Sequence, residues 1–211
     1  KRVRPISEEL GGKFCVPCDV TLDEQIIRTF KRVEKEFGTF DILIHSVAFA
    51  PQDALKGRFI DTTRPAFRQA LDISAYSLIA LTREAYPFMK EQGGSIIAMT
   101  YYAAEKVFPN YNVMGVAKAA LEANVRYLAE AVGVDGIRVN AISAGPVKTL
   151  AASGVGGFHQ IAAHIEAHAP LRCNIDQLDV ANTALFLCSD LSRRITGGVH
   201  FVDSGYNIMG M

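Results

Sequence analysis

The chain has no net charge, no hydrophobic run of membrane-spanning length and few cysteines. Its 22 basic residues balance 22 acidic residues, so no overall field attracts nucleic acid or an anionic membrane surface. No apolar run approaches the ~20 residues of a spanning helix, and no signal peptide is recognisable. We therefore expect neither a nucleic-acid nor a membrane partner, and a cytoplasmic location.

Four cysteines do not make a disulfide framework in a chain of this size. Cys15 and Cys18 form a Cys-x-x-Cys pair, but no second pair stands at the spacing of a zinc site. His164 and His168 are four residues apart, yet Glu166 does not complete a His-Glu-x-x-His motif. We expect no metal site, and we interpret the cysteine pair as ordinary strand residues.

Short apolar runs alternate with longer helical patterns along the whole chain. The apolar runs predict strands at 14–19, 41–46, 95–100, 137–142 and 199–203. Alternation with helices implies parallel strands joined by right-handed crossovers, and strands that are apolar throughout indicate helices on both sheet faces. We predict one α/β domain over residues 1–211, a doubly wound, Rossmann-like parallel sheet. Thr21 and Glu24 match a capping box at the start of its first long helix.

No Gly-x-Gly-x-x-Gly turn follows any predicted strand, and the glycines at 154–157 do not connect a strand to a helix. A doubly wound nucleotide-binding fold begins with a βαβ unit of roughly 30 residues. Residues 1–10 resemble the helix after such a unit. We therefore expect the first βαβ unit to be missing from this chain, and we expect the 211 residues alone to bind a dinucleotide weakly or not at all.

Ligands of doubly wound sheets bind beyond the carboxyl ends of the strands. Four segments with distinctive polar, Gly and Pro residues follow predicted strands: 19–20, 46–51, 100–110 and 143–149. We expect the functional site to be built from these segments.

Tyr111 and Lys118 stand seven residues apart, almost two turns of an expected helix. On one helical face they would lie roughly 10 Å apart along the axis, with Gly115 between them leaving room for a ligand. A nearby ammonium lowers the pKa of a phenol, and such a Tyr stabilises an enolate when hydride reaches the adjacent carbon. The spacing alone favours an ordinary Tyr and Lys on a helix, because pairs at this spacing are common.

A second pair, Tyr102 and Lys106, fits the Tyr-x-x-x-Lys pattern of short-chain dehydrogenases. It directly follows a strand, and Pro109 precedes the next helix. Because that pattern needs one helical turn between the two residues, we interpret this pair as a chance match in a loop.

Several blocks closely resemble the bacterial enoyl-acyl-carrier-protein reductases, a divergent branch of the short-chain dehydrogenases in which Tyr-x6-Lys replaces Tyr-x3-Lys. The blocks are 45–51, 100–105, 109–118, 140–151 and 188–192. The resemblance implies reduction of a trans-2-enoyl thioester on acyl carrier protein, with hydride from NADH, in fatty-acid elongation. It also implies a homotetramer. NADPH stays possible, because the residues that select the coenzyme belong to the segment expected before Lys1.

Carried over residue by residue, the resemblance implies that Tyr111 binds the thioester carbonyl, Tyr101 is its companion and Lys118 binds the nicotinamide ribose. Ala50 and Phe158 are implied substrate contacts. Beside Lys118, the implied cofactor-binding residues are Asp19, Val20, Ser46, Val47, Ala48, Gly145, Pro146, Val147, Thr149, Leu150 and Ala151.

Residues 151–169 combine a glycine-rich stretch with an apolar helical stripe of Phe158, Ile161, Ala162 and Ile165. The stripe alone fits a surface helix, and with the resemblance it predicts a lid over the acyl chain. Two alternatives stay open: another short-chain dehydrogenase, such as a 3-oxoacyl-thioester reductase, and a non-catalytic fragment that retains fold and oligomer contacts. Small residues in the helix after Tyr111 suit close helix contacts between or within chains: Ala117, Ala119, Ala120, Ala123 and Ala129.

Overall fold

The computed structural model describes residues 3–147, 149 and 157–210. Its described residues form one sheet of parallel strands in the order β1-β2-β3-β4. The strands are β1 (Ile42–His45), β2 (Gly94–Thr100), β3 (Ile137–Ala144) and β4 (Val199–Val202). The α-helices are α1 (Val3–Glu9), α2 (Asp23–Phe37), α3 (Arg64–Leu71), α4 (Ser77–Met89), α5 (Val113–Gly133), α6 (Phe158–His168) and α7 (Gln177–Cys188).

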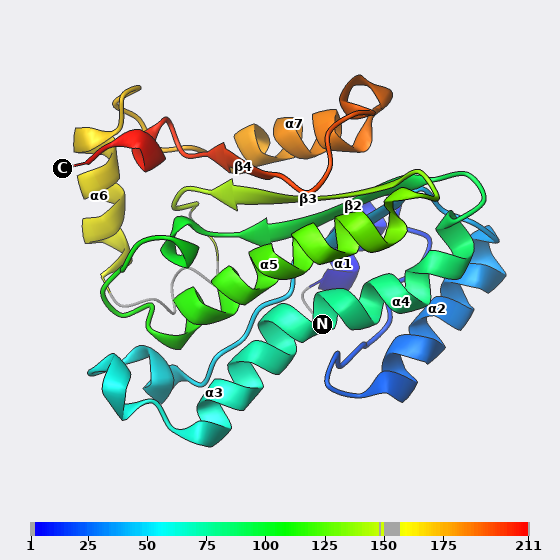
Figure 1. Cartoon of the computed structure of the whole chain (residues 1–211), viewed down its shortest axis with the longest axis horizontal. Helices are drawn as coiled ribbons and strands as arrows, with labels where there is room; N and C mark the ends of the chain where they lie inside the picture. Colours follow the sequence, from blue (N-terminus) through cyan, green and yellow to red (C-terminus); the bar gives the residue numbers. More distant parts are fainter. Residues whose placement is uncertain (1–2, 148, 150–156, 211) are drawn as a thin grey trace.

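Helices cover both faces of this sheet (Figure 1), which confirms the doubly wound prediction. Because side chains of a strand alternate between faces, Ile96 and Ala98 of β2 pack with α2, α4 and α5. Ile97, between them, packs with Leu187 of α7 on the opposite face. The core therefore lies in two layers, one on each side of β2 and β3.

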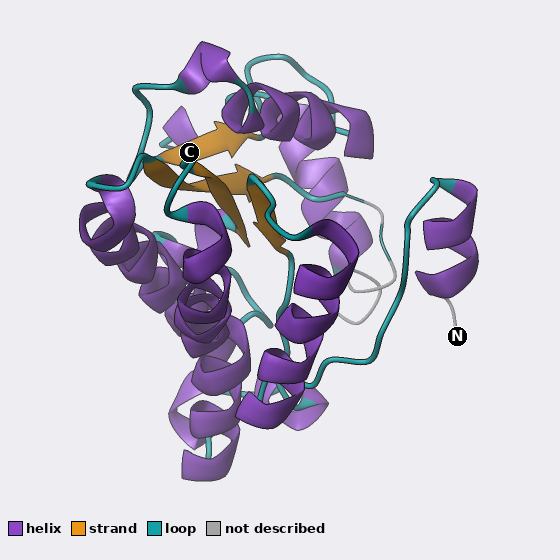
Figure 2. Cartoon of the chain, turned by 90° about the vertical axis from the view of Figure 1, so that its right-hand side faces the viewer, coloured by secondary structure: helices purple, strands orange, loops and turns teal. Residues whose placement is uncertain are grey.

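The strand predicted at 14–19 is wrong, because these residues form a loop. A strand needs a neighbour for its backbone hydrogen bonds, and within the described residues the sheet ends at β1. Pro17 also lacks the N–H group that a ladder uses. Figure 2 shows this loop running between α1 and α2. Helix α1 stands apart from the sheet and contains no buried residue.

The capping box predicted for α2 is also wrong. The helix begins at Asp23 with Leu22 as its N-cap, and no side chain caps it. The hydroxyl of Thr21 instead donates to the carboxylate of Asp19 at 2.8 Å, which closes a local turn. At α7, Asp176 and Asp179 form a full capping box.

The helical segment from Arg64 to Met89 is interrupted by a π-helical turn. This turn, Asp72–Tyr76, lies between α3 and α4 without a break in the chain's helical course. The side chain of Asn124 on α5 donates to the Ala75 carbonyl at 3.0 Å. Such turns change the direction of the side chains that follow them and are frequent at functional sites.

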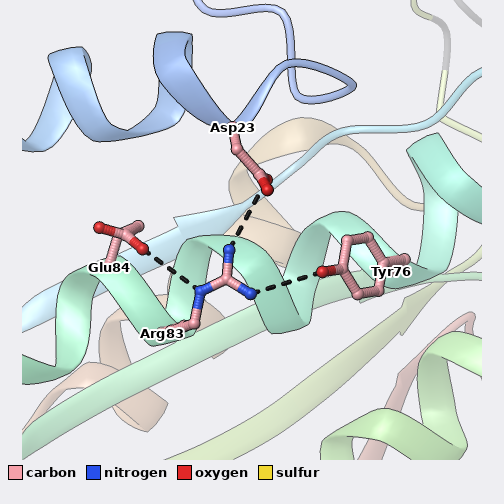
Figure 3. A network of polar contacts seen from close by, with 4 residues as sticks. All are labelled: Asp23, Tyr76, Arg83 and Glu84. Atoms are coloured by element: carbon pink, nitrogen blue, oxygen red, sulfur yellow. Dashed lines mark hydrogen bonds and ion pairs between the residues drawn. The ribbon is translucent and has the colours of Figure 1, made fainter.

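A polar network on α4 connects the first turn of α2 to the π-helical turn. Arg83 lies within 3.6 Å of Asp23 and within 3.4 Å of the Tyr76 hydroxyl, and it also pairs with Glu84 (Figure 3). These groups are largely exposed, so each contact contributes little to stability. The network orients α2 against α4 at the surface rather than forming a site.

Candidate active site

A cavity of about 680 Å³ lies at the carboxyl ends of β1, β2 and β3. Residues that follow each of these strands line it, and α6 and α7 contribute Phe158, Ile161, Gln177 and Val180. Three of the four predicted segments, 46–51, 100–110 and 143–149, contribute to the lining, whereas 19–20 does not. The predicted residues that line the cavity are Ser46, Ala48, Ala50, Tyr101, Tyr111, Lys118, Gly145, Pro146, Val147, Thr149 and Phe158.

Three predicted cofactor contacts do not line this cavity. Asp19 is exposed, and hydrogen bonds from the Thr21 backbone and hydroxyl hold the pKa of its carboxyl below the usual range. Val20 packs against the large core cluster, and Val47 is half-buried. Their roles stay predictions. Leu150 and Ala151 lie outside the described residues.

Tyr111 does not lie on the helix that carries Lys118. It occupies a turn, and α5 begins two residues later at Val113. Asn110 and Asn112 have left-handed backbone angles, with φ of 63° and 39°, which turn the chain sharply and prevent a helix from starting earlier. The prediction of one shared helical face is therefore wrong, although both side chains reach the same cavity. Strained backbone of this kind concentrates at functional sites.

The turn brings Tyr111 against Tyr101, which directly follows β2. Their ring centroids are 5.1 Å apart at an interplanar angle of 63°, an edge-to-face arrangement that aromatic rings favour. Phe108 packs on Tyr101 from the other side of the turn, with centroids 5.0 Å apart. The predicted pairing of the two tyrosines at one site is supported by this contact.

Burial raises the pKa of Tyr111 to about 12. The predicted lowering by the Lys118 ammonium is wrong, because loss of solvent dominates at this position. Burial also raises the pKa of Tyr101. Both phenols are protonated at neutral pH, so each acts as a hydrogen-bond donor rather than as a phenolate.

Lys118 is buried in the wall of the cavity, with 6% of its surface exposed. Its ammonium donates to the Met99 carbonyl at 2.7 Å. Burial lowers the pKa of Lys118 to about 8, and the Glu122 carboxylate opposes this shift. An ammonium has three N–H donors, so two are left for a ligand in the cavity.

Gly115 does not provide room for a ligand, as the sequence suggested. A Cβ at this position would come within 2.8 Å of the Ala103 carbonyl oxygen. The glycine therefore allows α5 to approach the short helical turn after Tyr101. In that turn Tyr102 is buried, and its hydroxyl donates to the Asn207 carbonyl at 2.8 Å. Tyr102 and Lys106 share no α-helix, so the interpretation of a chance match is confirmed.

Buried serines hold the segment after β1 in place, and sequence reasoning missed them. Ser74, in the π-helical turn, accepts from the Phe49 N–H at 2.9 Å, and its hydroxyl lies 3.0 Å from the Phe49 carbonyl. Ser77 donates to the Ile73 carbonyl at 2.6 Å and therefore accepts from Nε2 of His45 at 2.7 Å. The available signal was a pair of serines inside an otherwise apolar helix, where hydroxyls often contact backbone.

We expect Ser74→Ala to raise KM for the nucleotide cofactor roughly three- to tenfold with a smaller change in kcat, because the segment from Ser46 to Ala50 loses two hydrogen bonds. Stability should fall by about 1–2 kcal/mol. Steady-state kinetics and urea unfolding measure the two effects. Ser189→Ala is the matched control, because that hydroxyl contacts Phe186 at the far end of α7. Equal changes in the two variants would contradict the expectation.

The helical part of the predicted lid forms α6, and its role as a lid stays a prediction. Phe158 and Ile161 face the cavity, and Ile165 is buried. The stretch 151–156, also assigned to the lid, lies outside the described residues. On α6 the rings of His164 and His168 are stacked with centroids 4.1 Å apart. Within the described residues, no group of three or more His, Cys, Asp or Glu residues could hold a metal ion.

The sequence profile of the family described as enoyl-(acyl carrier protein) reductase matches residues 1–207, almost the whole chain. The chain belongs to this enoyl reductase family. Over all of its residues it is 54% identical to the enoyl-acyl-carrier-protein reductase (NADH) FabI of Aquifex aeolicus and spans 78% of that protein. It is 53% identical to enoyl-acyl-carrier-protein reductase (NADH) 1 of Rhizobium meliloti and spans 77% of it.

Solved structures of enoyl reductases share the fold. The Aquifex aeolicus enzyme superposes with a TM-score of 0.95 at 53% identity, and this chain covers 82% of it. The Anaplasma phagocytophilum enzyme in complex with NAD gives 0.93 at 47% identity, with 78% covered. The Bacillus cereus enzyme with NADP+ and an indole naphthyridinone gives 0.96 at 51% identity, with 82% covered. Each alignment includes 100% of the present chain.

None of the helices in the described part of this enoyl reductase is long and apolar enough to cross a membrane.

Proposed function

We propose that this protein reduces trans-2-enoyl thioesters carried by acyl carrier protein, with NADH as the reductant. The observation that carries the proposal is the convergence of Tyr101, Tyr111 and Lys118 on one cavity at the strand ends in a member of the enoyl reductase family. Curated relatives at about half identity bear the name of NADH-dependent enoyl-acyl-carrier-protein reductases, which supports the same reaction here.

The residues of the cavity fit a nicotinamide nucleotide. Lys118 offers ammonium donors for ribose hydroxyls, and Gly145, Pro146 and Val147 follow β3 where a doubly wound fold receives its cofactor. The lining of the cavity is largely apolar, including Met99, which suits a nicotinamide ring and an acyl chain. The names of the relatives support NADH as the coenzyme. Because the Bacillus cereus enzyme was solved with NADP+, activity with NADPH should be measured beside activity with NADH.

The cofactor, when bound, supplies a hydride to the β-carbon of the enoyl thioester. Tyr111 donates a hydrogen bond to the thioester carbonyl and stabilises the negative charge that develops on its oxygen. Its pKa of about 12 keeps the phenol protonated for this role. Tyr101 packs against it and limits the orientations of its ring. Phe158 and Ile161 of α6 line this part of the cavity. The enolate then takes a proton from water at its α-carbon, which completes the reduction.

Comparison of substrates tests the proposal directly. We expect the complete gene product to oxidise NADH with a trans-2-enoyl thioester and to leave a 3-oxoacyl thioester unreduced. The absorbance of NADH follows both reactions, and parallel assays with NADPH establish the coenzyme. Oxidation with the 3-oxoacyl thioester alone would favour an ordinary short-chain dehydrogenase and overturn the proposal.

We also propose that the protein assembles as a homotetramer. Large apolar side chains are exposed on α5 and α7, and burial of such patches stabilises association. They are Tyr127, Leu178, Leu185 and Phe186. Of the small residues on α5, Ala117 and Ala129 pack inside the chain, whereas Ala119 is exposed and available to a partner. Light scattering after size exclusion measures the mass, and a monomer at micromolar concentration would contradict the proposal.

A further inference from the structure

Two oppositely charged side chains are buried side by side on α5, where the helix packs on the end of β2. Lys118 and Glu122 are one helical turn apart and are only 6% and 7% exposed. Lys118 donates to the carbonyl of Met99 at 2.7 Å. Glu122 accepts from the hydroxyl of Thr100, the next residue of β2, at 2.7 Å. The pair therefore holds two consecutive residues immediately before Tyr101.

The reaction proposed above gives no role to Glu122, although burial of a carboxylate is costly. A buried charge needs several hydrogen bonds or a partner of opposite sign. The Thr100 hydroxyl gives Glu122 a single hydrogen bond. The ion pairs formed by the described residues do not include Glu122. One compensating charge is the Lys118 ammonium one turn before it, at the spacing where helical side chains of opposite charge attract each other.

Other charged groups near the pair also act on it. Burial raises the pKa of the Glu122 carboxyl, and Glu105, after β2, acts in the same direction. The hydrogen bond from Thr100, Arg126 one turn further along the helix, and Lys118 oppose this shift. On β1, His45 repels Lys118 when protonated, but burial lowers the pKa of His45 to about 4. The imidazole is therefore neutral at working pH. Glu122 is the group that favours the charged form of Lys118.

We propose that Glu122 is a positioning residue that keeps Lys118 protonated and directed toward the cofactor ribose. The ribose contact rests on the proposed function, whereas the charge coupling between the two side chains does not. Without the carboxylate, desolvation acts on Lys118 unopposed and the ammonium loses its proton at lower pH. A neutral amine is a weaker donor, so cofactor binding weakens in the same pH range.

The coupling is measured by NMR titration of the complete protein labelled with 13C-lysine, in which the Lys118 signal is identified by its loss in Lys118→Arg. We expect Glu122→Gln to lower the titration midpoint of Lys118 by about one pH unit. Gln keeps the volume of Glu and still accepts from Thr100. Glu122→Asp, which retains the charge, is expected to keep the midpoint near that of the wild type. Glu130→Gln, an exposed carboxylate on the same helix, should leave it unchanged.

The pH dependence of steady-state kinetics is the second measurement. We expect KM for NADH in Glu122→Gln to begin rising about one pH unit below the wild type, with kcat at saturating NADH little changed at pH 6. A Lys118 midpoint that is unchanged in Glu122→Gln would overturn the proposal. If the midpoint moves but KM shows no pH shift, the coupling is retained and the ribose role from the proposed function fails. If Glu122→Gln does not fold, Glu122→Asp is the test. A Lys118 midpoint about one pH unit below the wild type in Glu122→Asp would also overturn the proposal.

Discussion

Replacing Tyr111 with Phe is expected to lower kcat by about 10²–10³-fold. The substitution removes the hydroxyl that we propose contacts the thioester carbonyl, and it leaves the ring in contact with Tyr101. Because this hydrogen bond strengthens as charge develops on the oxygen, the loss should fall on kcat more than on KM for NADH. The measurement is steady-state oxidation of NADH with a trans-2-enoyl thioester.

Tyr127→Phe is the matched control for this substitution. Tyr127 lies on α5 but does not line the cavity, so removal of its hydroxyl should leave kcat unchanged. Tyr101→Phe should have a smaller effect on kcat than Tyr111→Phe, because we propose that Tyr111, and not Tyr101, donates to the thioester carbonyl. A Tyr111→Phe enzyme that retains more than about a tenth of the wild-type kcat would show that another group stabilises the enolate.

Replacing Lys118 with Met is expected to weaken NADH binding roughly 100-fold, because the two charge-assisted hydrogen bonds that we propose to the ribose would be lost. The affinity of the wild type for NADH should also fall gradually as pH rises. The pKa of Lys118 is about 8, so the ammonium is present below that pH and is lost above it. Affinity for NADH should therefore be constant from pH 6 to 7 and fall above pH 8. Fluorescence titration of NADH measures both effects.

Lys90→Met is the control, since that side chain is exposed at the end of α4. Lys118→Met also leaves the Met99 carbonyl without its donor, so thermal unfolding of each variant separates lost stability from lost affinity. Unchanged NADH affinity in a folded Lys118→Met protein would remove Lys118 from the cofactor site. A flat pH profile in the wild type would mean that its amine titrates outside this range.

Much of the fold was predictable because its strands carry a strong local signal. The strand pairs β1–β2 and β2–β3 join apolar runs that are recognisable in the sequence, and burial on both faces explains their composition. Residues 14–19 carry a similar apolar run and yet form a loop. Whether such a run becomes a strand depends on a neighbour to pair with, and a local pattern contains no information about that neighbour.

The residues of the candidate site were predictable in part. The topology identified the strand ends, and the resemblance identified Tyr101, Tyr111 and Lys118, which the structure brings to one cavity. Ser74 and Glu122 were missed. Their importance depends on contacts with Phe49 and Thr100, which are distant in the sequence.

By itself the sequence determined the alternation of strands and helices, the edge of the sheet where ligands bind, and the family. These depend on periodicity and on residue order, both of which are local. Only the tertiary structure decided that Tyr111 lies in a strained turn and that its pKa is raised rather than lowered. It also decided that Gly115 serves a backbone contact. These properties depend on burial and on distances between segments, which arise only when β2, its following turn and α5 are packed together.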